Sequence, residues 1–456
     1  MFPSSDDQDA AIHALYARFP DDPVRVLGIF ARPLFATVYV IPGLIGYPAM
    51  RVFTLLVCLA MAWLTYRAAE RAGLAFAWLA IPFVLTQPAL YQLGTETMTE
   101  PIFALTLAGG LYALAGGREI VAALVLSLLP LARPEGPVVL VTTAACWASR
   151  ALASRKTRLA IVLLAAGTAL WQVAWTLTTG DVRYIGHTLP WAFDTSAIHG
   201  DPLHYLIHWP AIIGLGVLPL WLIGAVVGRR MPLLRLAVAI TLAVLTVHTY
   251  LWAAGRLASW GFDRYFATLA PCTALLATAG LGALTKRRAA VAAGLAAPLL
   301  ILQAAQAFLY VDMNSNNYVA AATKEAVDHA RARIDLRGRP VLSADHFGYV
   351  FADVGAGSAQ LPVGDSSTVS RYLSQQPAGT VVLWDDLTGE TWYHLTADAI
   401  VGLGYRMLWD RKGEQVGSPR VPTYERWRLY THPRLYRSLG WGPSWRIVRE
   451  SALVRQ

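Results

Sequence analysis

Residues 122–150 read AALVLSLLPLARPEGPVVLVTTAACWASR. The stretch is apolar except at its centre, where Arg133, Pro134, Glu135 and Gly136 interrupt it. A run of this length can cross the hydrocarbon core of a bilayer, and the central interruption predicts a break or a re-entrant bend. A charge at membrane depth costs about 2.5–3.5 kcal/mol, so it is usually paired or functional. Arg133 and Glu135 therefore form a neutral pair or belong to a site.

The whole chain has the composition of a membrane protein. Of its 456 residues, 55% are hydrophobic and 15% are charged, and the mean hydropathy is +0.43. Soluble domains carry about 25% charged residues, so a purely cytosolic enzyme, a coiled coil and a disordered chain are excluded. The three cysteines all lie in apolar runs, which excludes a disulfide framework and a CxxC zinc or redox site.

Ten apolar segments are expected to form transmembrane helices. They lie near residues 48–67, 74–93, 100–117, 119–132, 136–150, 158–179, 205–228, 233–254, 264–285 and 288–311. The sequence therefore predicts an α-helical polytopic membrane protein.

Alternate loops between these segments collect positive charge. One set of loops holds 13 Lys and Arg residues and two acids, Glu70 and Glu119, which gives a net charge of +11. The other set, with the amino-terminal segment, holds 8 bases and 12 acids, which gives −4. By the positive-inside rule, the first set is cytoplasmic. The overall charge of +9 thus reflects topology, and it lends no support to nucleic-acid binding.

This topology divides the chain into three regions. We expect an extracytoplasmic acidic loop with interfacial helices over residues 1–46, a transmembrane domain over 47–311 and an extracytoplasmic domain over 312–456. Both ends would face the outside of a bacterial inner membrane, since ten crossings return the chain to the side where it began.

The carboxyl-terminal region has the pattern of a small α/β domain. A helix is expected over 320–333 and short strands over 340–343 and 379–384. The acids that follow these strands, Asp345 and Asp385, are the kind that form turns. No Walker loop or dinucleotide fingerprint occurs in the chain, so ATP and hydride chemistry have no visible site.

Three carboxylates, Asp6, Asp7 and Asp9, precede an amphipathic stretch near the amino terminus. Four apolar residues of that stretch fall on one helical face, namely Ile12, Leu15, Tyr16 and Phe19. Such a helix would lie in the membrane interface with the acids at its amino-terminal end. These acids could act as a general base or hold a divalent cation, and the alternative is a solvated terminus with an aspartate cap.

Two further sets of ionisable residues lie at expected outer helix ends. Glu96 and Glu100 precede Pro101, where Glu100 is also suited to a helix start. Arg264, followed by Tyr265, begins another helix, where it could meet a phosphate at the membrane surface or snorkel.

Histidines mark the loop around residue 200. His204 and His208 stand at i and i+4, a spacing that can place two imidazoles on one metal ion. Anchoring at the membrane surface, in the company of Trp209, is the alternative.

Taken in order, these motifs resemble the GT-C membrane glycosyltransferases, over residues 6–285. Asp9 stands nine residues before Arg18, as in that family's acidic first loop, and Arg32 with Pro33 resembles the second interfacial segment. The later motifs are at three helix ends: Thr97–Pro101, Ala132–Gly136, and Arg264 with Tyr265 and Pro271. The family places a transmembrane helix before the acidic loop, and five residues precede Asp6 here, so either the chain lacks this helix or its start codon is wrongly placed.

The resemblance implies transfer of a sugar from a polyprenyl-phosphate donor to the hydroxyl of a glycan, lipid or protein acceptor, with inversion. Asp9 would be the catalytic base, with Asp7 and Asp6 as alternatives, and the same acids would hold Mg²⁺ or Mn²⁺ if a cation is used. Arg264, Arg133 and Tyr265 would bind the donor phosphate. Further substrate-binding residues would be Glu96, Glu100, Glu135, Arg32 and His204.

Two other classes of function fit the same charges. A transporter or flippase would bind a phosphorylated lipid without breaking a bond, and a non-catalytic scaffold would only present the carboxyl-terminal domain. Acids and arginines gathered on one side of the membrane favour one-sided chemistry over alternating access.

Overall fold

The computed structural model describes residues 8–20, 22–30, 32–185, 199–256, 261–286, 288–310, 317–354, 361–362, 365–385, 388–390, 393–411, 415–416, 445–446 and 450–456. The chain forms two compact units. The membrane unit comprises Pro23–Tyr39 and Arg51–Val311, and the sheet unit comprises Met1–Asp22, Val40–Met50 and Asp312–Gln456. The three-region division expected from the sequence stays a prediction.

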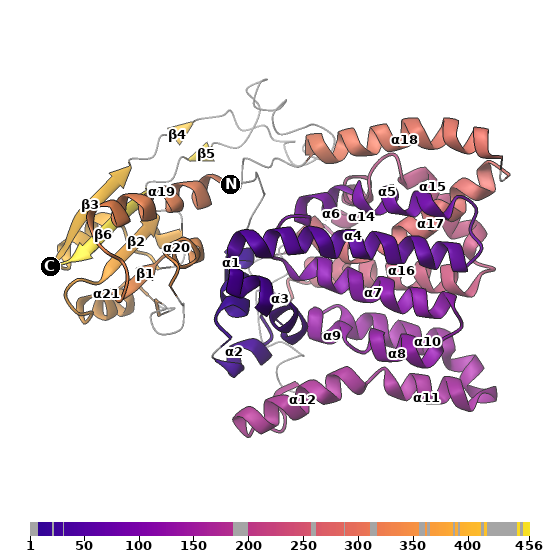
Figure 1. Ribbon diagram of the computed structural model, residues 1–456, viewed down its shortest axis with the longest axis horizontal. Coiled ribbons are helices and arrows are strands. Elements are labelled where there is room, and N and C mark those ends of the chain that lie inside the picture. Colours follow the sequence, from indigo (N-terminus) through magenta and orange to yellow (C-terminus); the bar gives the residue numbers. More distant parts are fainter. Residues whose placement is uncertain are drawn as a thin grey trace. The chain divides into compact units, whose positions relative to one another are not determined.

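The membrane unit is a bundle of α-helices (Figure 1). Two of its helices, α3 (Pro33–Ile45) and α4 (Tyr47–Arg71), each contain residues of both units. The other elements, with two 3₁₀ segments, are α2 (Pro23–Leu27), η1 (Ala77–Leu79), α5 (Ala80–Leu85), α6 (Pro88–Leu93), α7 (Thr99–Ala115), α8 (Glu119–Leu126), α9 (Leu129–Ala132), α10 (Gly136–Ala153), α11 (Arg155–Leu163), α12 (Ala166–Thr179), α14 (His204–Ile213), α15 (Leu218–Gly228), α16 (Pro232–Ala253), η2 (Asp263–Leu269), α17 (Ala270–Leu284) and α18 (Ala289–Tyr310).

All ten expected transmembrane segments are helical, but several of them are broken. Among the described residues, six helices are long and apolar enough to cross a membrane, or seven if the bent pair α14 and α15 counts as one. The expected span 74–93 divides into η1, α5 and α6, and Pro88 begins the last of these. The break expected at Arg133 is confirmed, because α9 ends at Ala132 and α10 begins at Gly136.

The expected span 205–228 is not one straight helix. α14 and α15 differ in direction by 103°. The bend lies at Gly214, whose φ of 94° is in the region that glycine adopts without strain. A Cβ there would lie 2.0 Å from Oε1 of Gln303, so the side chain of α18 occupies the space that the glycine leaves.

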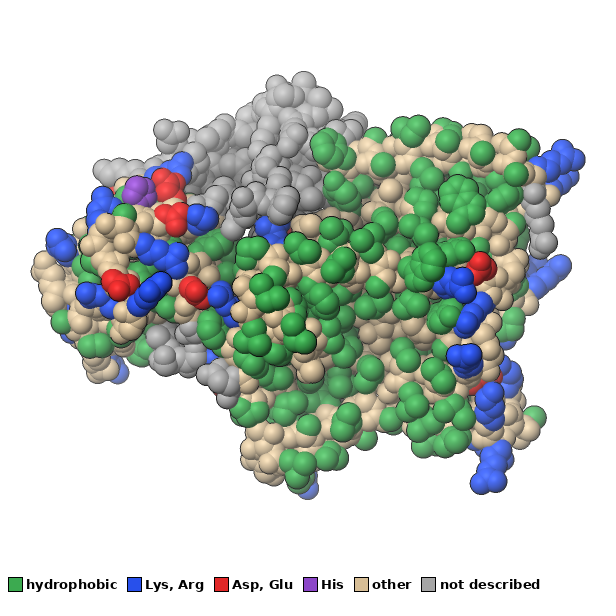
Figure 2. All heavy atoms as spheres, viewed as in Figure 1, with side chains coloured by type: hydrophobic (Ala, Val, Ile, Leu, Met, Phe, Trp, Pro, Cys, Tyr) green, Lys and Arg blue, Asp and Glu red, His purple; other side chains and the backbone are tan. Residues whose placement is uncertain are grey.

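The basic loops of the membrane unit lie together at one end of the bundle. Arg150 pairs with Glu119 at 2.9 Å, and Nζ of Lys156 donates to the Gly117 carbonyl at 3.3 Å. Figure 2 shows Lys and Arg side chains gathered at the end of the bundle, while hydrophobic side chains cover the helices between its ends. The other end of α7, at Thr99, is about 25 Å away along a 17-residue helix.

The sheet unit is built on a four-stranded mixed sheet, counted over the described residues. The strand order is β1 (Val341–Ser343), β2 (Val381–Asp385), β6 (Glu450–Arg455) and β3 (Tyr405–Arg411). β1 and β2 are parallel, and β6 is antiparallel to both of its neighbours. The unit also contains α1 (Gln8–Arg18), α19 (Asn317–Arg333), α20 (His346–Ala352), α21 (Ser366–Ser374), α23 (Ala397–Gly402) and the pair β4 (Gln415–Val416) and β5 (Trp445–Arg446).

Both faces of this sheet are covered, as the alternation of buried side chains requires. Leu342, Val382 and Leu453 pack on one face with α21 and α23. Val341, Val381 and Leu383 pack on the other face with α19. The helix expected over 320–333 and the strands expected over 340–343 and 379–384 are therefore confirmed, as part of a small α/β layer structure.

The buried face of α1 differs from the amphipathic face that the sequence suggests. Of the four apolar residues expected on the buried face, only Leu15 is buried. The other buried side chains of α1 are four alanines and a histidine, namely Ala10, Ala11, His13, Ala14 and Ala17. Small side chains let other backbone approach closely. A Cβ at Gly43 would lie 3.1 Å from the Ala17 carbonyl oxygen, and α1 also packs on α20.

The pairing of α15 with α17 provides a test of the bundle. A Cβ at Gly280 would lie 2.0 Å from the carbonyl oxygen of Leu220, so the Gly280→Ala substitution forces two backbones apart. We expect this substitution to destabilise the protein by about 1–3 kcal/mol, the usual cost of overpacking.

Gly294→Ala in α18 is the matched control, because nothing lies within 4 Å of its Cβ. Thermal unfolding in detergent should leave this control unchanged or slightly more stable, since alanine favours helix. Equal melting temperatures for the two variants would contradict the observed packing.

Candidate functional site

The interrupted stretch around Arg133 forms a buried charged cluster in the membrane unit. Pro130 is within the one-turn helix α9, and Arg133 follows it in an extended conformation with φ −155° and ψ 158°. Gly136 then begins α10, where a Cβ would lie 2.2 Å from the Pro130 nitrogen. The chain therefore folds back tightly here, and it turns the Arg133 side chain into the protein, where it is 7% exposed.

Arg133 binds two carboxylates from two different helix ends. Its Nε and Nη2 donate to Oε2 and Oε1 of Glu135 at 3.0 and 2.9 Å, a bidentate pair. Its Nη1 lies 2.9 Å from Oε1 of Glu100 and donates to Oγ1 of Thr99 at 2.8 Å. Thr99 and Glu100 are the first residues of α7, so Arg133 ties the start of α7 to the start of α10.

The rings of His248 and Tyr265 complete the surroundings of this ion pair. Nε2 of His248, on α16, lies 3.2 Å from Oε1 of Glu135. The His248 ring stacks on Tyr265 with the centroids 4.9 Å apart, and Arg133 lies over the same tyrosine ring at 5.6 Å. Four elements thus meet around Glu135: the α9–α10 turn, α7, α16 and η2.

Arg264 lies at the edge of the same cluster. Its Nε is 3.8 Å from Oε1 of Glu100, and its guanidinium lies over the Phe262 ring at 4.7 Å. The contact with Glu100 is longer than the 2.9 Å contact of Arg133 with the same oxygen. Glu100 therefore lies closer to Arg133 than to Arg264.

Arg32 is a third buried arginine of the membrane unit. It donates to the Pro130 carbonyl at 3.4 Å and lies 5.5 Å over the Trp171 ring. Burial lowers the pKa of Arg32 to about 10; Glu135 opposes this shift and Arg133 adds to it. Arg32 precedes Pro33 at the start of α3, and its φ of 60° is unusual for a residue other than glycine.

The cluster is close to neutral by composition. Arg133 and Arg264 face Glu100 and Glu135, all of them buried. The Glu135 carboxylate accepts two hydrogen bonds from Arg133 and lies 3.2 Å from Nε2 of His248. A buried carboxylate needs such partners, because an unpaired buried charge is strongly destabilising.

The structure brings together five of the residues expected at a site: Glu100, Arg133, Glu135, Arg264 and Tyr265. Glu96 is also buried and lies three residues before Thr99. His204 lies beside His208 and Asp263, and Asp263 immediately precedes Arg264. Sequence reasoning missed His248, although a histidine in an expected transmembrane helix is itself a signal, because polar groups are expensive there.

Asp9 belongs to the sheet unit and is the second residue of α1, where the helix dipole stabilises a carboxylate. His346, the first residue of α20, is its electrostatic neighbour in that unit. Asp6 and Asp7 lie outside the described residues, so an amino-terminal cation site stays a prediction. Asp345 caps α20 by accepting from the Phe347 amide at 2.9 Å, as expected of a turn-forming acid.

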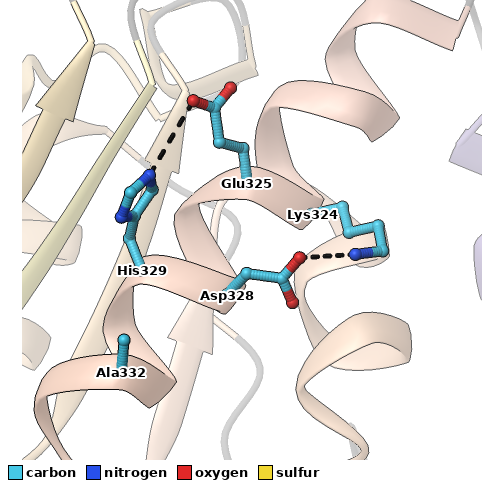
Figure 3. A pocket seen from close by; sticks show the side chains of 5 residues that line it. All are labelled: Lys324, Glu325, Asp328, His329 and Ala332. Carbon is cyan, nitrogen blue, oxygen red and sulfur yellow. Dashed lines mark hydrogen bonds and ion pairs between the residues drawn. The ribbon is translucent and has the colours of Figure 1, made fainter.

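A shallow hollow lies on α19 in the sheet unit (Figure 3). Its charged side chains already pair with one another. Lys324 pairs with Asp328, and His329 lies 3.9 Å from Glu325, which also accepts from Arg411 at 2.8 Å. These pairs are typical of a solvated helix face, and we assign the hollow no chemistry.

The sequence matches no protein-family model. It also shows no significant similarity to any curated protein.

Solved structures nevertheless share the fold. The crystal structure of ArnT from Cupriavidus metallidurans bound to undecaprenyl phosphate superposes with a TM-score of 0.59 at 12% identity, over 84% of this chain and 89% of ArnT. The apo state of the same protein gives a TM-score of 0.58 at 14% identity, over 86% and 89%. The GT-C fold and the multi-pass membrane architecture are thereby confirmed.

The ion-pair geometry predicts the cost of removing its centre. Arg133→Ala leaves Glu100 and Glu135 buried without their cation, so we expect a destabilisation of about 3–5 kcal/mol. Arg150→Ala is the matched control, because the side chain of Arg150 is 48% exposed in its pair with Glu119. Exposed pairs contribute about 1 kcal/mol or less. Denaturation in detergent compares the two, and equal losses would show that the buried pairing is not needed.

The environment of His346 predicts a pH effect on the sheet unit. Burial lowers the pKa of His346 from 6.5 to about 4, with Asp9 opposing. Between these two values the unfolded chain binds the proton and the folded chain does not, so stability must fall as the pH drops from 6.5 towards 4.

Hydrogen exchange of the α20 amides, corrected for the intrinsic pH dependence, measures this effect. Protection at pH 5 relative to pH 7 should fall in the wild type and fall less in His346→Phe, which cannot bind the proton. The same loss in both proteins would assign the effect to other groups.

Proposed function

We propose that the protein transfers a sugar from a polyprenyl-phosphate donor to a hydroxyl group on the outer face of the bacterial inner membrane. The observation that carries this proposal is the buried arginine and carboxylate cluster at broken helix ends, at the opposite end of α7 from the basic loops. The ArnT structure with the same fold has undecaprenyl phosphate bound, which supports a lipid phosphate as the group recognised here.

The arginines would have different tasks. Arg133 donates from Nε, Nη1 and Nη2 to protein groups, which suits a positioning residue that keeps α7 and α10 together. Nε of Arg264 lies 3.8 Å from Oε1 of Glu100, so a phosphate oxygen can replace this long contact while Glu100 stays paired with Arg133. We therefore assign the donor phosphate first to Arg264, with Tyr265 beside it, and a supporting charge to Arg133.

The reaction would be a single displacement with inversion. Asp9 takes the proton of the acceptor hydroxyl, the hydroxyl oxygen attacks the anomeric carbon, and the bond from that carbon to the phosphate oxygen breaks. Polyprenyl phosphate leaves with the bonding electron pair, and an arginine stabilises the charge that develops on it. Glu96, Arg32 and His204 remain candidates for binding the acceptor or the sugar, and the acceptor class remains a glycan, a lipid or a protein.

The competing proposal is a transporter or flippase for a lipid-linked substrate. It would use the same arginines to bind the phosphate, but no bond would break. The two proposals differ in the need for a base, so the Asp9 variant separates them.

Asp9→Asn should lower sugar transfer at least 100-fold, because a positioned general base contributes about 10²–10⁴-fold to a rate. The assay uses purified protein and a panel of synthetic polyprenyl-phosphate sugars with labelled sugar moieties. Asp328→Asn on α19 is the control, since that carboxylate pairs with Lys324 on an exposed helix face. Full transfer by a folded Asp9→Asn protein would remove the base assignment, and lipid binding without transfer by every form would favour the transporter.

Arg264→Gln should raise the KM for the lipid-phosphate donor about tenfold or more, because a charge-assisted bond to phosphate is replaced by a neutral one. The acceptor KM should change little. A variant with an unchanged donor KM and a melting temperature equal to that of the wild type would exclude Arg264 from the phosphate site.

A further inference from the structure

Two histidines and an aspartate form a compact group in the membrane unit, next to the charged cluster in sequence. One ligand atom from each of His204, His208 and Asp263 lies within 4.8 Å of the other two. The histidines are one turn apart on α14, and their ring centroids are 4.0 Å apart. Asp263 is the first residue of η2 and immediately precedes Arg264.

The polar contacts of the group converge on the same place. Nδ1 of His208 lies 2.9 and 3.0 Å from the two carboxylate oxygens of Asp263. Nε2 of His204 lies 2.8 Å from the carbonyl oxygen of Gly261. Gly261 has a φ of 69°, and a Cβ there would lie 3.2 Å from Nε2 of His204, so a glycine suits this close approach.

Two neutral imidazoles and a carboxylate are a ligand set that zinc prefers. Tetrahedral zinc with bonds of about 2.0–2.1 Å spaces its ligand atoms about 3.3 Å apart, so shifts of about 1 Å or less bring the three groups to this spacing. A water molecule or the Gly261 carbonyl can supply the fourth ligand. His204 also packs on Trp252, with the centroids 5.3 Å apart, which limits the movement of its ring.

An ordinary structural account also exists for each residue. His204 and His208 already have a hydrogen-bonding partner in Gly261 and Asp263, and such contacts could simply fasten η2 to α14. That account explains each contact separately. It does not require the two histidine rings to lie 4.0 Å apart, with a ligand atom of each within 4.8 Å of the same carboxylate.

We propose that His204, His208 and Asp263 bind one zinc ion, which joins α14 to the start of η2. The ion is structural: it fixes the segment that carries Arg264 and Tyr265, and it takes no part in bond making or breaking. The proposal is independent of the sugar-transfer proposal, because it concerns metal binding by this group whatever reaction the protein performs.

Metal binding is measured on the full chain in detergent, after proteolytic removal of any polyhistidine tag and treatment with a chelator. Equilibrium dialysis against ZnCl₂ followed by elemental analysis gives the stoichiometry, and cobalt substitution reports the geometry through the strong visible bands of four-coordinate Co²⁺. The wild type should bind one zinc ion, and the cobalt form should be four-coordinate. His208→Gln and Asp263→Asn should each lower the zinc affinity at least tenfold.

His329→Gln is the matched control, because His329 also faces a carboxylate, that of Glu325 at 3.9 Å, on an exposed helix. It should bind zinc like the wild type. Hydrogen exchange supplies the second readout: zinc should slow exchange in η2 of the wild type and of His329→Gln, and not in His204→Asn.

The three substitutions are made at separate ligands, so the test stays informative if one variant fails to fold. The melting temperature of each metal-free variant, compared with that of the metal-free wild type, shows which variants are folded. Absence of zinc binding by the wild type, or unchanged zinc affinity in the folded variants, would overturn the proposal. Zinc binding that all variants and the control lose equally would assign the ion to another site.

Discussion

The bidentate pairing of Arg133 with Glu135, shared with Glu100, is the interaction on which the end of the bundle depends. None of these charges is tolerable alone in a bundle surrounded by lipid, and each is made tolerable by the others. The pairing is possible because the chain leaves helical geometry between α9 and α10. A continuous helix through residues 122–150 would turn Arg133 and Glu135, two positions apart, to different sides.

This constraint explains why several helices begin at the cluster. α7 begins at Thr99 and α10 begins at Gly136, and both of these starts contact Arg133 directly or through Glu135. Helix starts carry partial positive charge, which adds to the stabilisation of the two carboxylates. At the other end of the same helices, the bases pair near the surface or extend from it, as Arg150 does with Glu119. The bundle is therefore asymmetric, with buried balanced charge at one end and exposed positive charge at the other.

Much of the helical architecture follows from hydropathy, because transmembrane length and apolar composition are local properties of a sequence. The break at Arg133 was predictable for the same reason. The bend at Gly214 was not predictable, because it depends on Gln303 in α18, far along the chain, whose side chain fills the space beside the glycine. The buried face of α1 was not predictable either, because it depends on packing partners. Alanine is only weakly hydrophobic, and the alanines of α1 are buried because Gly43 and α20 pack against this helix. The acids and arginines of the cluster could be predicted from their motifs, but their pairing could not. His248 lies inside the expected span 233–254 and belongs to no motif, so the sequence does not link it to the cluster.

The pairing pattern also supports different proposed roles for Arg133 and Arg264. A phosphate that binds Arg133 through Nε and Nη2 must displace the Glu135 carboxylate, which is held by two parallel hydrogen bonds, and must leave this buried carboxylate without its bidentate partner. In the proposed function, a phosphate at Arg264 replaces the 3.8 Å contact with Glu100, and Glu100 keeps its 2.9 Å contact with Arg133. The proposed assignment therefore leaves both Glu100 and Glu135 paired with Arg133. Arg133 can then act on the ligand through its charge while its hydrogen bonds stay with the protein.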